Sequence, residues 1–208
     1  MDVVNRLGSA LQAEPRRRRY ALAAGLVAVL ATLAACGGSS TQSLSEAQIA
    51  TNDVNAGLSA QAAGRLADAA TDYKNAITHD PRNTFAYYDL GLVDQLQGQA
   101  AAAEQNYRAA IQIDPNFAPA LFNLAILRTV PSPAEAEELY RHVISISPND
   151  AAAHLNLGFL LRAEGRTAEG NTELNTAVSL DASLANRIPP GTLATPKAAT
   201  PKASPTPG

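Results

Sequence analysis

The stretch TFAYYDLGLVDQLQGQAAAAEQNYRAAIQIDPNF, residues 84–117, decides the fold because its pattern recurs on both sides of it. Identical residues lie 34 positions upstream of seven of its members, at Gly57, Gly64, Ala69, Tyr73, Ala76, Asp80 and Pro81. Downstream, the pattern continues at a spacing of 33 with Ala136, Tyr140, Val143 and Pro148, and then at 34 with Gly170, Leu174 and Ala177. A period of this length predicts an array of helix pairs that stack on one another.

Small and bulky residues fall where a pair of packed helices needs them. Gly91 lets the first helix approach the second, where Tyr107 supplies bulk. Gly98 fits the left-handed residue that ends a helix, and the pair that begins at Asp114 ends the second helix because proline disfavours helical geometry in the residue before it. We predict helices near 45–62, 66–79, 83–97, 100–113, 117–129, 132–146, 151–163 and 167–181, the first of them opened by a capping box in SEAQ, residues 45–48.

These recurring positions resemble the tetratricopeptide repeat (TPR), and the resemblance covers residues 50–184. It implies an all-α fold, a right-handed superhelix of antiparallel helix pairs. We expect a TPR domain over 45–184, with about four repeats at 50–83, 84–117, 118–150 and 151–184. Two repeats depart from the family pattern. The third has Pro131 and Pro133 instead of a turn glycine, and the fourth has Gly170 and Ala182 where the family has alanine and proline.

Residues 1–35 have the pattern of an export signal. The basic n-region, 1–19, ends in four arginines, and the apolar h-region, 20–35, carries no charge and is shorter than the roughly 20 residues that span a bilayer. LAAC, residues 33–36, resembles the lipobox of bacterial lipoproteins. The resemblance implies a lipid on Cys36, a flexible tether over 36–44, and anchoring on the extracytoplasmic side of the cell membrane. An uncleaved signal anchor and a structural buried cysteine are the alternatives.

The C-terminal residues, 185–208, predict a disordered tail, because they are rich in Pro, Thr and Ala and offer little apolar bulk to bury. Within them ANRIPPG, residues 185–191, is too broken by its two prolines to predict a helix. The apolar face around Leu174, Val178 and Leu180 is then either partly exposed, which would offer a self-association surface, or covered by Ile188 and the chain that follows.

Charge and motifs argue against nucleic-acid binding and against catalysis. After residue 35 the chain has 11 Lys and Arg against 17 Asp and Glu, whereas phosphate binding needs clustered basic residues. His79, His142 and His154 lie far apart, and none has a partner at metal-ligand spacing. We therefore expect no enzyme activity, no cofactor and no metal. His154 is expected to be packed and hydrogen-bonded, and the other two histidines to lie near helix ends.

The TPR resemblance also implies a concave groove lined by the first helix of each repeat. Carried over to this sequence, the partner-binding groove residues are Val54, Leu58, Phe85, Tyr88, Leu92, Gln95, Phe122, Ile126, Leu155, Phe159 and Arg162. They are mostly apolar, which favours an amphipathic helix or an extended apolar segment over the carboxylate clamp of some family members. The aromatic ones also suit packing between repeats. Asn55, Asn123, Asn156 and, in the corresponding place, Asp89 match the polar residues of the family consensus. They are expected to hydrogen-bond between helices, and the alternative is that they hydrogen-bond the backbone of a ligand.

Together these features predict a membrane-anchored TPR lipoprotein that serves as a scaffold and binds a protein or peptide partner in the cell envelope. A receptor or sensor for a small apolar molecule is an alternative that would need a closed pocket. The second alternative is a membrane protein that keeps its signal segment as an anchor and has the same binding domain.

Overall fold

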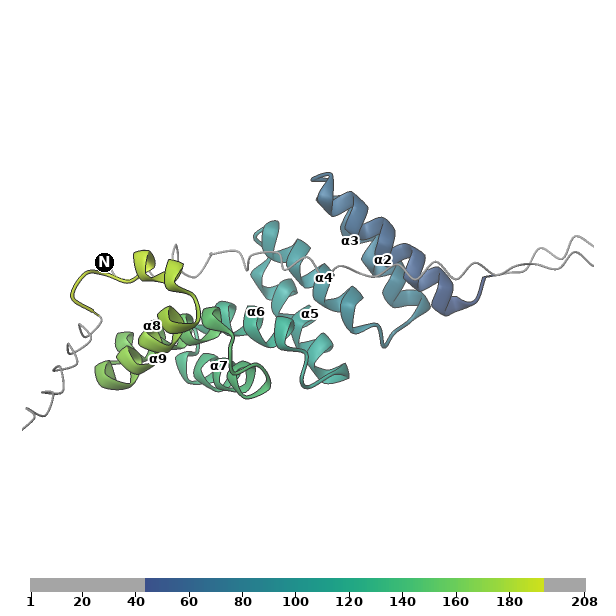
Figure 1. The fold of residues 1–208 in the computed structure, drawn as a ribbon. Helices are drawn as coiled ribbons and strands as arrows, with labels where there is room; N and C mark the ends of the chain where they lie inside the picture. The colour runs from purple at the N-terminus through teal and green to yellow at the C-terminus, as the bar shows by residue number, and fades with distance from the viewer. Residues whose placement is uncertain (1–43, 193–208) are drawn as a thin grey trace, which may run out of the picture. The chain divides into compact units, whose positions relative to one another are not determined.

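The computed structural model describes residues 44–192, and every regular element within them is helical. The elements are α2 (Glu46–Ala62), α3 (Leu66–His79), α4 (Thr84–Leu96), α5 (Ala100–Ile113), α6 (Ala118–Arg128), α7 (Pro133–Ile146), α8 (Ala151–Ala163), α9 (Thr167–Leu180) and the 3-10 helix η1 (Ala182–Arg187). Consecutive helices pack in antiparallel pairs (Figure 1). The predicted all-α fold is confirmed, and each predicted α-helix matches to within one residue at each end.

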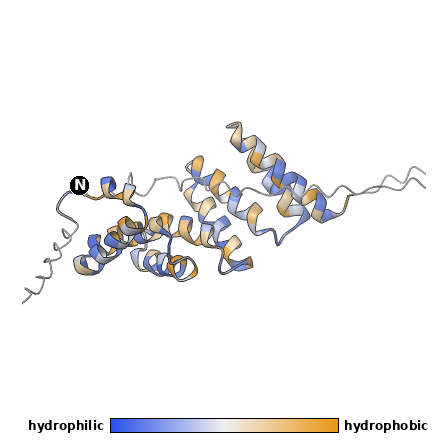
Figure 2. Cartoon of the chain, viewed as in Figure 1, coloured by the Kyte–Doolittle hydropathy of each residue, from blue (hydrophilic) through white to orange (hydrophobic). Residues whose placement is uncertain are grey.

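The described residues form two compact units, which we call the N-terminal unit, 44–115, and the C-terminal unit, 116–192. Each contains two helix pairs. Within a pair the first helix is the more apolar, as α4, α6 and α8 show against α5, α7 and α9 (Figure 2). A second helix with one apolar stripe suits a position between its partner and solvent.

In the N-terminal unit, glycine and tyrosine set the distance between paired helices. A Cβ atom on Gly57 would lie 2.5 Å from Cε1 of Tyr73, and one on Gly91 would lie 2.7 Å from Cε1 of Tyr107, so only glycine fits at either place. Gly98 ends its helix with a φ of 75°, as predicted. The predicted capping box of α2 is also present. The Ser45 hydroxyl accepts a hydrogen bond from the backbone amide of Gln48, and the Gln48 side chain accepts one from the backbone amide of Ser45.

The C-terminal unit repeats this packing with different residues. Gly158 faces Leu174, and a Cβ atom at that glycine would lie only 2.8 Å from the leucine Cδ2 atom. Ala125, which is fully buried, occupies the corresponding place on α6. The turn between α6 and α7 has no glycine. Thr129 ends α6 in right-handed helical geometry, and Pro133 opens α7 at a position where its missing N–H is not needed.

The prediction that residues 185–191 contain no helix was wrong for the first part of that stretch. Ala182–Arg187 forms η1, because the Asp181 carboxylate accepts from the amide of Ser183 at 2.9 Å and starts the turn. Both prolines follow the end of η1, so they do not interrupt it. Ile188 then packs on Leu155, Leu174 and Ala177, with Leu184 beside them. Of the two predicted arrangements the structure has the covered one, although Leu180 stays 39% exposed.

Candidate functional site

Apolar side chains gather on the first helices of the N-terminal unit. Val54 and Leu58 are one turn apart on α2. Phe85, Tyr88 and Leu92 follow at the i, i+3, i+7 spacing of one face of α4, and α2 contacts α4 within the unit. We call these five residues, together with Asp89, the α2–α4 face. Leu58 is 46% exposed and Phe85 is 62% exposed, while the other apolar members are half-buried.

Half-burial on this face comes from packing against the second helices. Val54 lies against the core cluster that contains Tyr73 and Leu90. The Tyr88 ring is tilted by 40° to the Tyr107 ring, with centroids 6.0 Å apart. Val54 and Tyr88 are therefore held in place by packing, whereas Leu58 and Phe85 remain exposed.

Gln95, predicted as a groove residue, belongs to the interior of its own helix pair. Its Oε1 accepts a hydrogen bond of 2.8 Å from the Tyr107 hydroxyl. The same bond joins Tyr73 to Gln61 one repeat earlier. In both pairs the glutamine satisfies a buried phenol that would otherwise lack a partner.

The predicted groove residues of the C-terminal unit are largely used for packing. Phe122 is buried and meets the Tyr140 ring edge-on, at a centroid distance of 5.9 Å. Leu155 is fully buried, and Phe159 packs on the cluster around it. Arg162 donates to the side chain of Asn171. Ile126 is half-buried. The structure therefore presents fewer accessible apolar groups at these positions than at those of the N-terminal unit.

Asp89 belongs to the α2–α4 face, and its burial without a partner was not predicted from the sequence. The expected hydrogen bond between helices is absent, because among the described residues Asp89 has no hydrogen-bond or ion-pair partner. Burial raises the pKa of its carboxyl to about 7. Burial also raises the pKa of Tyr73 and of Tyr107, and in each case the Asp89 charge adds to the shift. The available signal was an acid where the other repeats have Asn55, Asn123 and Asn156.

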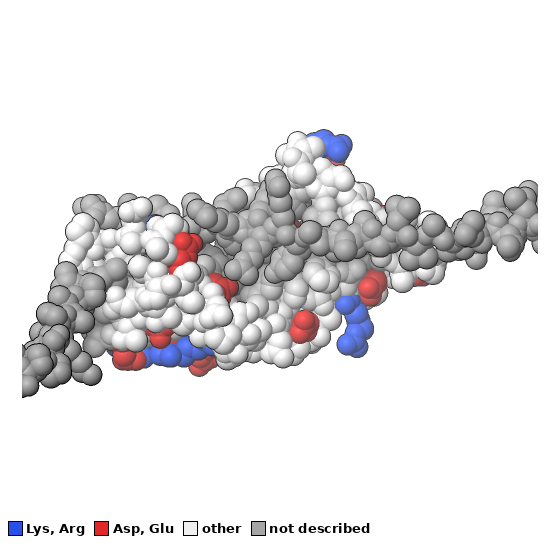
Figure 3. Space-filling view, viewed as in Figure 1, with Lys and Arg blue, Asp and Glu red and all other residues white. Residues whose placement is uncertain are grey.

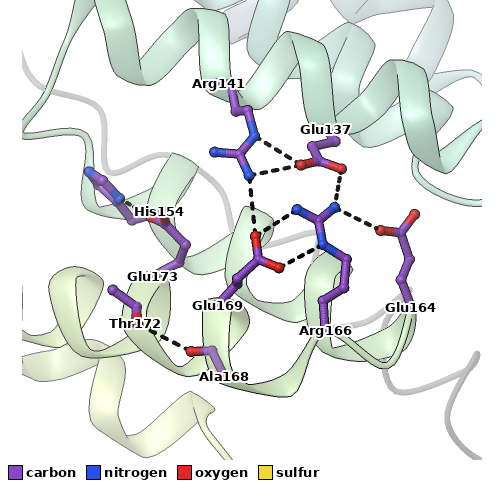
Figure 4. Close-up of polar contacts among 9 residues, drawn as sticks. All are labelled: Glu137, Arg141, His154, Glu164, Arg166, Ala168, Glu169, Thr172 and Glu173. Atoms are coloured by element: carbon purple, nitrogen blue, oxygen red, sulfur yellow. Dashed lines mark hydrogen bonds and ion pairs between the residues drawn. The ribbon is translucent and has the colours of Figure 1, made fainter.

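An ion-pair cluster joins α7 to α9 in the C-terminal unit (Figure 4). Arg166 Nη1 lies 2.6 Å from Glu137 and its Nη2 lies 2.7 Å from Glu169, while Arg141 also pairs with Glu137. The hydrogen bond from Arg166 lowers the pKa of Glu137, and the same guanidinium lowers that of Glu169. These charges are mutually paired, which makes the cluster a contact between helices.

The histidines behave as expected. His154 is buried, with Nδ1 2.6 Å from a Glu173 oxygen and Nε2 3.0 Å from the Pro148 carbonyl (Figure 4). His79 lies at the end of α3 beside Glu46, and His142 contacts Asn116. Within residues 44–192 no three His, Cys, Asp or Glu side chains are grouped so that they could hold a metal ion.

The predicted lipid-attachment residue, Cys36, lies outside the described residues, as do the signal segment and most of the tail. Over the part of the chain that is described, no helix is both long and apolar enough to span a bilayer.

Comparison with solved structures finds the same fold in several proteins. The crystal structure of MamA matches with a TM-score of 0.60 at 22% identity over 66% of this chain and 81% of that one. YrrB, described as a TPR protein with an unusual peptide-binding site, matches with a TM-score of 0.60 at 20% identity, covering 66% and 72% of the two chains. The first TPR of Spaghetti (RPAP3), solved with the HSP90 peptide SRMEEVD, matches at 0.55 and 20% identity, covering 57% and 95%.

No curated protein matches this chain in sequence. A family model does match, over residues 56–186, which is more than half of the chain. That model is described as the middle TPR-like domain of cilia and flagella-associated protein 70. The chain has the helix pairs, the glycine-tyrosine packing and the repeat spacing described above, and it belongs to this family of TPR-like domains.

Proposed function

We propose that this protein is an exported, lipid-anchored TPR scaffold of the cell envelope, without enzyme activity, that binds a polypeptide segment of another protein on its α2–α4 face. The observation that carries the proposal is the exposure of Leu58 and Phe85 together with the half-buried apolar members of that face. Exposed apolar groups on adjacent helices gain free energy when a partner covers them.

Peptide binding by similar structures supports this mode. YrrB is described as having a peptide-binding site, and the Spaghetti TPR was solved with a bound peptide. The chemistry of the α2–α4 face differs from a site for a terminal carboxylate, because α2 and α4 contain neither Lys nor Arg. Apolar anchors are therefore expected to supply most of the affinity, as a segment docks with side chains at regular spacing.

The proposed location at the cell membrane rests on the sequence that precedes the TPR domain. An apolar h-region behind four arginines, ending in LAAC at residues 33–36, supports export and lipid attachment at Cys36. Two or three acyl chains hold a protein stably at a membrane, whereas one is marginal. Anchoring would bring the TPR domain among envelope proteins, and the short tether would keep it close to the membrane surface.

The binding face can be tested in the cells that make the protein by site-specific photo-crosslinking. A photoreactive benzoylphenylalanine replaces Phe85, and in a matched protein it replaces Val130, which is 66% exposed in the turn between α6 and α7. We expect one discrete crosslinked polypeptide from position 85, none from position 130, and loss of the crosslink when Leu58→Ala is added. The same bands from both positions, or no band from position 85, would reject the proposal.

A further inference from the structure

Every charged side chain on the first helices of the N-terminal unit is acidic. These residues are Glu46 and Asp53 on α2 and Asp89 and Asp94 on α4. The unit as a whole carries nine Asp and Glu against four Lys and Arg over residues 44–115. Figure 3 shows acidic and basic side chains on one face of the described residues. A ligand of this face therefore approaches negative charge, which favours cationic partners.

Two of these four acids, Glu46 and Asp94, have hydrogen-bond partners within the unit. Glu46 lies 2.6 Å from Nδ1 of His79. Asp53 lies 3.9 Å from Nε2 of the same ring, which is too far for a hydrogen bond, and its buried Oδ2 has no hydrogen-bond partner. Asp94 accepts a hydrogen bond of 2.7 Å from Asn106. Asp89 also lacks a described hydrogen-bond donor, and unlike Asp53 it belongs to the α2–α4 face.

Asp89 lies within the apolar stripe that would receive a ligand. It is four residues after Phe85 and three before Leu92, so the three share one face of α4. Its neighbour on α4, Tyr88, packs on Tyr107, and the Asp89 charge helps to raise the pKa of both Tyr73 and Tyr107. A carboxylate that is half-buried without a partner is unfavourable, and a cation brought by a ligand would relieve that cost.

We propose that the α2–α4 face selects a polypeptide segment in which a Lys or Arg is flanked by apolar residues, with the cation paired to Asp89 and the apolar side chains on Leu58 and Phe85. This inference rests on the proposed binding function and adds the chemistry of the ligand to it. Lys and Arg suit this role because their aliphatic stems cover apolar surface while the charged end reaches the carboxylate. Charge-assisted hydrogen bonds of this kind are stronger than neutral ones.

A phage-displayed library of random 12-residue peptides tests the proposal against full-length protein in detergent. Selections are run on the wild type, on Asp89→Asn, on Asp89→Lys and on Asp68→Asn. The last is the matched control, because Asp68 is an exposed acid on α3 that pairs with Arg65. We expect the wild type and the control to enrich peptides with a Lys or Arg between apolar residues. Asp89→Asn should lose the preference for a cation, and Asp89→Lys should enrich acidic residues instead.

An enriched peptide then gives a quantitative test. Replacing its Lys or Arg by norleucine should weaken binding to the wild type about 10-fold or more and change binding to Asp89→Asn less than about threefold. Enrichment that is lost on Leu58→Ala but never shows a cation preference would overturn this inference and leave the proposed binding face in place. Enrichment that is indifferent to Leu58→Ala, or no enrichment at all, would overturn both.

Discussion

Tyr73, Tyr107 and Tyr140 are each fully buried, yet each phenol finds a polar group near the end of the facing first helix. The partners are Gln61 and Gln95 at 2.8 Å and, for the third tyrosine, Thr129 at 3.4 Å. The fourth repeat has Leu174 in the tyrosine position, so it has no phenol to satisfy. Its Arg162, at the position of Gln95, donates a hydrogen bond to Asn171. Spacing alone predicted which bulky residue faces which small one. It did not predict these hydroxyl partners, because a polar residue at a groove position looks the same in sequence whether it faces inward or outward.

Gly91 gives the most direct test of this packing. Gly91→Leu does not lower the helix propensity of α4, since leucine is a good helix former. The leucine side chain would, however, occupy the space of the Tyr107 ring. We expect a loss of about 2–3 kcal/mol in the free energy of unfolding from overpacking, measured by urea denaturation. Ala101→Leu is the control, because that position on α5 is exposed. Equal stability of the two variants would show that the close approach does not constrain the pair.

Asp89 predicts a pH dependence of stability with a definite sign. The folded pKa of about 7 lies above the ordinary value of 3.8, so the folded state holds its proton more tightly than the unfolded state. Stability from this group is complete below pH 4 and is lost as pH rises through 7. At about 1.4 kcal/mol per unit of pKa, Asp89→Asn should be more stable than wild type by about 2–4 kcal/mol at pH 8, and nearly equal at pH 4. Parallel urea denaturation at both pH values measures this. A constant difference between the two proteins across that range would contradict it.

Among the described elements, η1 is the helix that the sequence did not predict. The eight α-helices followed from the period, from the left-handed glycines and from Asp-Pro, because these signals act within a few residues. The 3-10 turn after Asp181 depends on a side-chain cap and on the apolar cluster that Ile188 completes, and the second of these is visible only in three dimensions. The two prolines predicted no helix in residues 185–191, and that prediction was wrong because both prolines follow the end of η1.

Ile188 is expected to act as the cap of the last helix pair. Ile188→Ala should cost about 2–4 kcal/mol of unfolding free energy, since it leaves a cavity against Leu155 and Leu174. The same change should promote association between copies, because it uncovers the apolar end that the sequence suggested as a self-association surface. Urea denaturation and light scattering measure the two effects. Leu180→Ala, at a position 39% exposed, is the control and should change neither. A stable, monomeric Ile188→Ala would mean that the residue does not cap the repeat.

At the scale of the whole molecule, the fold was predictable and the site only in part. The repeat period predicts the helix pairs because each repeat places small and bulky residues at the same positions. Leu58 and Phe85 lie exposed among the predicted binding residues, whereas Phe122 and Leu155 are buried. A short stretch of sequence cannot distinguish these cases, because burial of a first helix depends on the neighbours packed against it.

Lipid attachment is the whole-molecule prediction that follows from the sequence before the domain. Cells grown with an alkyne-bearing palmitate should incorporate it into the wild-type protein and not into Cys36→Ser, because that substitution removes the sulfur that receives the lipid. The variant should also migrate as an uncleaved precursor. Label on Cys36→Ser, or a wild type without label, would contradict lipidation and favour the uncleaved signal anchor.

The most direct test of the α2–α4 face is the affinity of an enriched peptide, fluorescein-labelled and titrated by anisotropy against full-length protein. Truncating central anchors of an interface typically costs about 1–2 kcal/mol or more each, so Leu58→Ala with Phe85→Ala should raise Kd at least about 10-fold. Val130→Ala with Leu180→Ala removes exposed apolar groups elsewhere and should leave Kd unchanged. Equal affinities of the two double variants would contradict binding on the α2–α4 face.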